Sequence, residues 1–541
     1  MRESLNLSRN YLVAFARALL DEVEATLGLL PGSPLRAETR RARRALLATR
    51  RLGPGDGRRV AAAKDAFLRL CAAYERAVHA LHPALVEGKR LFYVFPGLVV
   101  PLELRESSDV LMQKSAKPRA IEKMLAAVAR ISRGGEAVWY ARGFIVSMTG
   151  SAEHLLRAEA LVTKAFGVPA LPVIPLFETS EALDAGVAIV RSVLATPRFG
   201  RAVRERWQQF EIMVGYSDSS KQAGVLPSRV AIARAMHALE AECVRADVRP
   251  VFFQGSGGSV DRGGGTIPEQ VAWWPKAALR TYKVTIQGEM VERSLSDAAI
   301  ARGQIERIAA SAAEALERRP RPPESEALFR FAARVSDGYR ATIHDPEFLR
   351  VVDGATPYAH LSALKIGSRP ARRTKEISVE GLRAIPWVLC WTQTRVLFQT
   401  WWGVGTAWRE CGEGERAALA RAYRDEPVFN SYVKALAFTL AKVELPMWKI
   451  YLDESGLDAA LASRFYAAFT EELRAAGELV RALAGEENLL WFRPWLGASI
   501  RLRSPIIHPL NLLQILAMES EDTVLFRSAA TGISAGMMTT G

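Results

Sequence analysis

Several features that mark common classes of protein are missing from this sequence of 541 residues. No stretch of eighteen apolar residues runs without a charge, so the sequence predicts no transmembrane helix. The first thirty residues carry acids among their apolar residues, which favours an amphipathic helix over a signal peptide. No internal repeat or low-complexity segment is evident.

Cysteine is scarce, and the four cysteines (Cys71, Cys243, Cys390 and Cys411) lie far apart without a CxxC pair. This pattern argues against a disulfide framework and against a metal-thiolate site, and it favours a reducing, cytoplasmic location. None of the seven histidines forms an HxxxH pair, so zinc is not expected either.

The composition is that of a globular protein, with 49% hydrophobic and 24% charged residues. The net charge of +14 comes partly from an arginine-rich segment at residues 36–59. Because that segment has helical spacing and no interleaved aromatic residues, it favours a solvated helix face, with nucleic-acid binding as the alternative. A site for an anionic substrate is another source of basic charge.

The apolar pattern changes along the chain. Residues 1–90 read as helices, broken at residues 31–34 and 53–57. Short apolar runs then alternate with helical stretches, and from about residue 300 helical patterns dominate. Buried strands that alternate with helices predict a parallel α/β sheet or barrel. The runs lie at residues 91–104, 143–148, 169–177, 210–216 and 248–254.

Polar residues follow the ends of these predicted strands, where a β/α barrel carries its reactive groups. They are Arg105, Glu178, Asp218 and Lys221, together with a glycine-rich loop after Phe253. Their shared position at strand ends carries more weight than any one of them.

The glycine-rich loop at residues 254–265, QGSGGSVDRGGG, directly follows a predicted strand. Such loops let backbone N–H groups approach an anion closely, and Arg262 within the loop favours anion binding over a plain surface turn. The loop matches neither a Walker A motif nor a GxGxxG motif, so the usual nucleotide folds do not fit.

Two acids and a lysine form a second candidate site. Asp218 in GYSDSSKQAG can bind a hard divalent cation, and Lys221 can contact a phosphoryl or carboxyl group. Glu178 supplies a second carboxylate, and magnesium typically takes one or two carboxylates plus substrate oxygens. The alternative is an ordinary turn, in which this spacing is also common.

Arginines at the edges of apolar segments form a third group, which contains Arg105, Arg369 and Arg383. Arginines that converge on one pocket bind phosphate bidentately, whereas single ones often serve as structural ion-pair partners.

Five segments stand in an order that resembles phosphoenolpyruvate carboxylase: EIMVGYSDSSKQAG, FFQGSGGSVDRGG, TIQGEMV, IGSRPARR and LRAIPWVLCWTQTR. The resemblance runs from about residue 92 to the C-terminus. It implies a β/α (TIM-type) barrel core with extensive additional α-helices, and a cytoplasmic homo-oligomer, a tetramer or dimer, without a membrane or nucleic-acid partner. It also implies a carbon–carbon lyase that joins bicarbonate to phosphoenolpyruvate with Mg²⁺ or Mn²⁺, giving oxaloacetate and phosphate.

The resemblance also implies three parts and a set of site residues. Residues 1–90 form an N-terminal helical segment, 91–300 carry the barrel strands and the main catalytic segments, and 301–541 form a mainly helical part whose tail completes the site. By position, Glu178 and Asp218 match metal ligands, and Lys221, Arg262, Arg383 and Arg105 match catalytic cations. Arg369, Gln287, Gln254, Ser256, Met213 and Leu176 match substrate-site positions, and Lys442 and Arg503 match residues that bind an acidic effector.

The sequence departs from this family at the bicarbonate site. Gln254, Gly255 and Ser256 stand where the family has histidine, glycine and arginine, and Thr539 replaces an asparagine. The family's threonine-alanine-histidine-proline segment is not found; His82, placed at the end of a predicted helix, is the nearest candidate. A paralogue with another electrophile therefore stays open beside the carboxylase, as do a non-catalytic regulator and a nucleic-acid-binding role.

Overall fold

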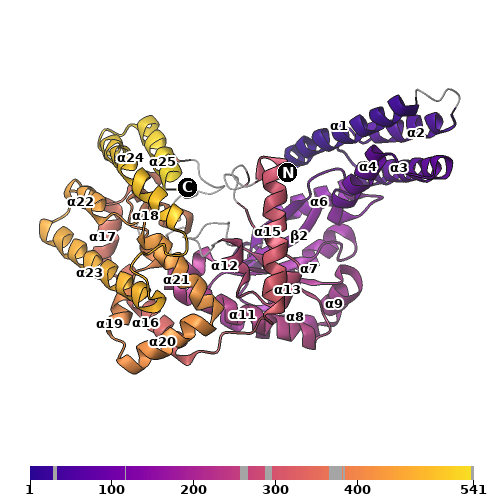
Figure 1. Cartoon of the computed structure of the whole chain (residues 1–541). Coiled ribbons are helices and arrows are strands. Elements are labelled where there is room, and N and C mark those ends of the chain that lie inside the picture. Colours follow the sequence, from indigo (N-terminus) through magenta and orange to yellow (C-terminus); the bar gives the residue numbers. More distant parts are fainter. Residues whose placement is uncertain are drawn as a thin grey trace. The chain divides into compact units, whose positions relative to one another are not determined.

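The computed structural model describes residues 1–27, 33–115, 117–255, 266–286, 291, 295–364, 381 and 384–537. The described part is predominantly helical and contains six strands (Figure 1). No helix in these ranges is long and apolar enough to cross a membrane. Two compact units are formed, one by residues 1–176, 188–212 and 246–249, and the other by residues 177–187, 213–245 and 250–541.

The first half of the chain alternates between helices and strands after an all-helical start. The elements are α1 (Arg2–Leu27), α2 (Leu35–Leu47), α3 (Asp56–Val78), α4 (Pro83–Val94), β1 (Leu102–Ser107), α5 (Ser108–Met112), α6 (Ala120–Ser132), η1 (Ala137–Trp139), β2 (Ala141–Ser147), α7 (Ala152–Phe166), β3 (Val173–Phe177), α8 (Ser180–Ala195), α9 (Pro197–Arg201), η2 (Ala202–Trp207), β4 (Phe210–Val214), α10 (Ser217–Ala223), α11 (Val225–Arg245), β5 (Pro250–Gln254), α12 (Ile267–Val271), α13 (Lys276–Arg280) and β6 (Lys283–Val284).

The second half is helical in the described residues, as the sequence predicts. The elements are α15 (Ala298–Glu317), α16 (Glu326–Ile343), α17 (Pro346–Gly354), η4 (Pro357–Ala363), α18 (Ala384–Gln393), η5 (Phe398–Thr400), α19 (Val404–Arg409), α20 (Glu413–Asp425), α21 (Pro427–Leu440), α22 (Leu445–Asp453), α23 (Ala459–Ala484), α24 (Pro494–Glu519) and α25 (Thr523–Gly536).

The N-terminal helices α1 to α4 pack around one apolar core within the first unit. Its members include Leu20, Val23, Leu70 and Leu85, which recur at helical spacing and are almost completely buried. The helical character predicted for the described residues before residue 90 is confirmed, whereas a further break, at residues 79–82, was not predicted.

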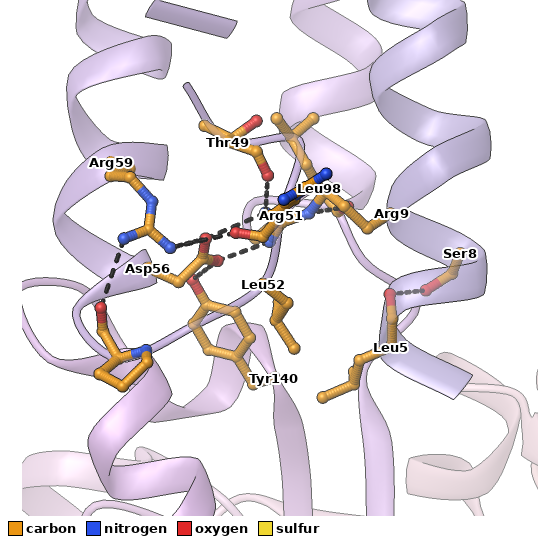
Figure 2. A network of polar contacts seen from close by, with 12 residues as sticks. Leu5, Ser8, Arg9, Thr49, Arg51, Leu52, Asp56, Arg59, Leu98 and Tyr140 are labelled. Carbon is orange, nitrogen blue, oxygen red and sulfur yellow. Dashed lines mark hydrogen bonds and ion pairs between the residues drawn. The ribbon is translucent and has the colours of Figure 1, made fainter. Parts of the chain in front are cut away.

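A buried ion pair ties this bundle to the strands of the same unit (Figure 2). The Arg9 guanidinium on α1 binds the Asp56 carboxylate at the start of α3, with its Nη2 2.6 Å from Oδ2, and both side chains are fully buried. The Tyr140 hydroxyl, just before β2, donates to the same carboxylate at 2.8 Å. Arg9 also donates to the backbone oxygens of Thr49 and Leu98, so one side chain joins four chain segments.

Two expectations for residues 79–104 are wrong. His82 begins a helix instead of ending one: its Nδ1 accepts a hydrogen bond from Ala84 N at 3.1 Å, and Pro83 occupies the first turn of α4. The apolar run at residues 91–104 is not one strand, because its first residues end α4 and bury Leu91 and Phe92 in the helical core. β1 begins only at Leu102.

The six strands form a sheet in the order β1-β2-β3-β4-β5-β6. The pairs β1–β2, β2–β3 and β5–β6 are parallel, which confirms the predicted α/β arrangement. The described residues therefore show six strands, whereas a closed TIM barrel has eight. The sixth strand, β6, has only two residues, and the apolar pattern of the sequence did not predict it.

Candidate active site at the strand ends

The carboxyl ends of four strands lie next to one another in the second unit. Gly215 N, after β4, donates to Phe177 O at the end of β3, and Gly255 N, after β5, donates to Val214 O at the end of β4, both at 2.8 Å. Thr285 N, after β6, donates to Gln254 O, also at 2.8 Å. The residues that follow these strands are therefore neighbours along a single edge, where α/β proteins bind their ligands.

Three predicted site residues belong to this edge. Glu178 directly follows β3 and is buried, with 6% of its surface exposed. Asp218 and Lys221 lie one turn apart on α10, which begins three residues after β4, and the Lys221 Nζ is 3.9 Å from the Asp218 Oδ1. Lys221 is 6% exposed, so its ammonium group is largely withdrawn from solvent, and Asp218 is more accessible. Buried charges at a strand edge are the arrangement expected of a site for an anion and a cation.

Gly255 must be glycine because β4 approaches it too closely for a side chain. A Cβ atom there would lie 2.7 Å from Val214 O, and the Met213 methyl group would be 3.6 Å away. Met213 itself is buried on β4, as is Leu176 on β3. The apolar side chains predicted to wall the site are thus core residues of the strands.

Gln254 is fully buried at the end of β5. Its side-chain oxygen accepts a hydrogen bond from the Tyr216 hydroxyl at 2.6 Å, and its Nε2 lies 3.7 Å from the Met236 Sδ. Burial raises the pKa of Tyr216, so the phenol stays protonated and remains a donor. The amide at the family's histidine position therefore holds Tyr216 in place.

Arg229 on α11 is a buried cation of this unit that the sequence analysis did not single out. Its Nη1 lies 3.5 Å from the Ser431 Oγ, and burial lowers the pKa of its guanidinium while the charge of Glu269 opposes that effect. Ser431 in turn donates to Glu269 O at 2.8 Å. In the sequence, the one hint that this arginine is buried is its position in the apolar stretch VLPSRVAIA.

Of the two candidate effector residues, Lys442 lies in the turn between α21 and α22, and Arg503 lies on α24. Lys442 is 2% exposed, and its ammonium group is 4.1 Å from the centre of the Phe438 ring. Arg503 is half-buried, and its Nε donates to Ser499 O at 3.4 Å. A third cation, Arg395, was not predicted as a site residue, although it is the last residue of the family-like segment LRAIPWVLCWTQTR.

Arg395 joins the segments that carry these two residues. Its Nη2 lies 2.6 Å from the Ser504 Oγ, which donates to the Glu444 carboxylate at 2.5 Å, and Glu444 N donates to Arg395 O. Burial lowers the pKa of Arg395, and the charge of Glu444 opposes that effect. Lys442 precedes Glu444 by two residues and Arg503 directly precedes Ser504, so this buried cluster positions both.

The remaining predicted residues are placed separately or lie outside the described ranges. Arg105 is on β1 of the first unit, exposed, in register with Ile145 of β2. The positions outside the described ranges are Ser256, Arg262, Gln287, Arg369, Arg383 and Thr539.

The strand edge has the right donors for a hard divalent cation. It offers two carboxylates, Glu178 and Asp218, and magnesium takes one or two with substrate oxygens completing the shell. No cluster of three or more His, Cys, Asp or Glu side chains that could hold a metal is found in the described ranges. The donor set therefore fits magnesium or manganese held jointly by protein and substrate, and does not fit a site closed by protein alone.

The fold and this edge define an α/β protein with a candidate site for an anionic substrate and a divalent cation. The family model of phosphoenolpyruvate carboxylase matches residues 99–541. The chain belongs to the phosphoenolpyruvate carboxylase family, as its motifs predict.

Curated relatives agree with this assignment. A phosphoenolpyruvate carboxylase of Xanthomonas oryzae is 33% identical over 76% of this chain and 48% of its own length. That of Chromobacterium violaceum is 33% identical over 85% of the chain and 53% of its own length, and phosphoenolpyruvate carboxylase 2 of Chlamydomonas reinhardtii is 34% identical over 74% and 35%. The chain spans about half the length of the bacterial relatives it matches.

Proposed function

We propose that this chain is a carbon–carbon lyase that carboxylates phosphoenolpyruvate with bicarbonate, giving oxaloacetate and phosphate. The observation that carries the proposal is the strand edge of the second unit, where Glu178, Asp218 and Lys221 follow neighbouring strands. The matched family supports the choice of substrate. A homo-oligomer, a complete TIM barrel, a cytoplasmic location and the three-part division at residues 90 and 300 belong to the same proposal.

In this reaction an oxygen of bicarbonate attacks the phosphorus atom of phosphoenolpyruvate, and the bond from phosphorus to the enol oxygen breaks. Carboxyphosphate and the enolate of pyruvate result. Carboxyphosphate then splits into carbon dioxide and phosphate, and carbon 3 of the enolate forms a bond to carbon dioxide. A divalent metal bound by Glu178 and Asp218 would supply Lewis-acid stabilisation of the enolate oxygen.

The chain's own residues are proposed to supply charge, to orient the substrate and to exclude water. Lys221 is proposed to bind an anionic oxygen of substrate or intermediate, where its low exposure strengthens the interaction. Arg105, Arg262, Arg369, Arg383 and Gln287 are carried over from the resemblance as further contacts to substrate anions. Met213 and Leu176 are proposed to present apolar surface to carbon dioxide and to exclude water from the enolate.

The test is an assay of oxaloacetate from phosphoenolpyruvate, Mg²⁺ and bicarbonate, coupled to malate dehydrogenase, with phosphate release measured in parallel. Equal rates of oxaloacetate and phosphate formation are expected. Phosphate without oxaloacetate would instead identify a paralogue that uses water or another electrophile. Absence of metal-dependent phosphoenolpyruvate binding would contradict both and leave a non-catalytic role.

A variant at Gln254 and Ser256 tests the bicarbonate step most directly. Because the Gln254 amide is committed to Tyr216, we expect a slow bicarbonate step in the natural chain. Gln254→His combined with Ser256→Arg should raise the rate of oxaloacetate formation, toward the roughly 10²–10⁴-fold that a positioned proton-transfer group contributes. Ser256→Arg alone is the control, and an unchanged rate in the double variant would show that the departure from the family extends beyond these two positions.

A further inference from the structure

A cavity of about 530 Å³ lies within the second unit, between helices α8, α11 and α16. Each of the three helices turns one face toward it, because the lining residues stand at helical spacing. On α16 these residues are Phe329, Ala332, Ala333, Ser336 and Arg340. The volume lies within the range of about 300–1,000 Å³ that is usual for cavities that bind small molecules.

This cavity is separate from the candidate active site. The residues Glu178, Asp218 and Lys221 of that site do not line it. It reaches Ser180 and Ala223, which lie two residues after Glu178 and Lys221 respectively. A molecule bound in the cavity would therefore lie beside the chain segments that carry the candidate site without occupying that site.

The wall of the cavity is mostly apolar, and much of it consists of small side chains. Helix α11 contributes Ala231 and Ala235, α16 contributes Ala332 and Ala333, and the larger Leu183 lines the α8 side. Because an alanine side chain is a single methyl group, the two alanine faces leave space that larger side chains would fill. The apolar part of a ligand is stabilised in such a space, since it leaves contact with water.

Three charged side chains line the same cavity: Asp184 on α8, Arg234 on α11 and Arg340 on α16. None of the three forms an ion pair within the part of the chain that the structure describes. The guanidinium carbon of Arg234 lies 4.6 Å from the centre of the Phe329 ring, so this group is stacked at the cavity wall. Two guanidinium groups against one carboxylate leave an excess of positive charge, which favours a ligand with a single negative charge.

The two arginines contact different parts of the cavity. Phe329 and Arg340 lie three turns apart on α16, about 16 Å along the helix axis, and Arg234 stacks on Phe329. Arg340 can therefore bind a carboxylate through paired N–H donors at one end. The Arg234–Phe329 pair presents planar surfaces on which an aromatic ring stacks. A second negative charge on the ligand would be repelled by Asp184.

We propose that the cavity between α8, α11 and α16 is a binding site for a small aromatic carboxylate. Arg340 binds the carboxylate, and the ring lies between the alanine faces of α11 and α16, toward Arg234 and Phe329. Phosphoenolpyruvate and bicarbonate have no such aromatic body, so this site serves a ligand other than the substrates of the proposed reaction.

The test uses 2-naphthoate as the probe and its neutral analogue 2-naphthamide as the chemical control. Binding of each to the full chain is measured by equilibrium dialysis without Mg²⁺, phosphoenolpyruvate or bicarbonate. We expect one saturable site that binds naphthoate about tenfold more tightly than naphthamide, since only the carboxylate forms charge-assisted hydrogen bonds. Arg340→Gln should abolish this preference. Arg234→Gln should weaken both compounds, because it removes a stacking surface that both use.

Matched controls exist on the same helix. Arg330→Gln removes an exposed arginine of α16 that does not line the cavity, and it should leave both dissociation constants unchanged. Ala333→Trp should fill the cavity and prevent binding of both compounds, whereas Ala341→Trp, at an exposed position of α16 outside the cavity, should not. Because Ala333 is exposed, thermal unfolding of its variant should match that of the natural chain. Lys221→Ala should leave naphthoate binding unchanged.

Four results would overturn the proposal. They are the absence of saturable naphthoate binding at millimolar concentration, a preference for naphthoate that Arg340→Gln does not reduce, equal weakening by Arg330→Gln, and loss of binding in Lys221→Ala, which would place naphthoate in the candidate active site. Because binding is measured without substrates and metal, it is independent of carboxylation. A chain that binds naphthoate but forms no oxaloacetate would contradict the proposed function alone, and an active chain that does not bind naphthoate would contradict this inference alone.

Discussion

Lys221 and Asp218 share one turn of α10, and each contributes charge at the strand edge. We expect Lys221→Ala and Asp218→Ala each to lower the turnover number for oxaloacetate by about 10²–10³-fold or more, the size of effect seen when one preorganised charge-stabilising group is removed. Steady-state kinetics at saturating phosphoenolpyruvate measures the loss, and circular dichroism checks the fold.

Lys276→Ala is the matched control for this pair, because Lys276 is exposed at the start of α13. It removes the same side chain without touching the edge. Near-normal turnover in either α10 variant would show that the candidate site is misplaced.

His237 on α11 gives a prediction about pH. Its pKa is lowered by burial, partly offset by a hydrogen bond with the backbone of Trp273. The folded state therefore binds fewer protons than the unfolded state at pH values below the unfolded pKa of about 6.5. The stabilising contribution is complete above that pH and is lost as the pH falls toward the folded pKa.

We accordingly expect the free energy of unfolding to decline as the pH falls below about 6.5, and His237→Gln to remove part of this decline. Urea denaturation at several pH values from 7.5 to 5 measures it. His344→Gln serves as the control because His344 is exposed at the end of α16. Parallel curves for the natural chain and His237→Gln would rule out this assignment.

At the scale of elements, the Arg9–Asp56 pair holds α1 and α3 to the segment before β2. Arg9→Met leaves the Asp56 carboxylate buried with fewer partners, and breaking a buried pair from one side costs about 3–5 kcal/mol. A clear fall in the thermal midpoint of the first unit is expected by calorimetry.

Arg17→Met is the comparison, because Arg17 forms an exposed pair with Asp21 on the same helix. Exposed pairs contribute about 0–1 kcal/mol, so this variant should unfold close to the natural midpoint. Equal effects of the two substitutions would mean that the buried pair does not anchor the bundle.

The relation between sequence and structure differs from one element to another. The apolar runs at residues 143–148, 169–177, 210–216 and 248–254 correctly predicted β2 to β5, although not their exact bounds, because buried parallel strands are short, continuous apolar runs. The run at residues 91–104 was wrongly predicted as a single strand. Its first residues belong to the buried apolar face of helix α4, and the length of an apolar run does not distinguish a buried strand from such a helix face. β6 was missed because two residues have no period.

For the whole molecule, the net charge of +14 suggests polyanion binding, but the arginine-rich segment is partly engaged within the fold. Arg43 pairs with Asp21 and Glu24, and Arg59 pairs with Asp56. We therefore expect no dedicated nucleic-acid surface at residues 36–59, only a general electrostatic attraction that salt weakens.

Heparin chromatography tests this expectation by comparing two sets of four Arg→Gln substitutions. One set removes exposed arginines of the segment (Arg40, Arg44, Arg50 and Arg51), and the other removes exposed arginines of α15 and the residues after it (Arg302, Arg307, Arg319 and Arg321). Similar shifts in the eluting salt concentration are expected. A much larger shift for the first set would indicate a specific binding surface.

The sequence by itself determined the family, the alternation of strands and helices, and the residues at the strand ends, because motifs and apolar periodicity are local properties of the chain. Only the tertiary structure decided the burial and partners of individual side chains. It showed that Gln254 supports Tyr216, that Arg229 and Arg395 are buried cations, and that a cavity lies between α8, α11 and α16. Burial is decided by what packs against a residue, and some of those neighbours lie more than a hundred positions away in the sequence, as Ser431 does for Arg229 and Ser504 for Arg395.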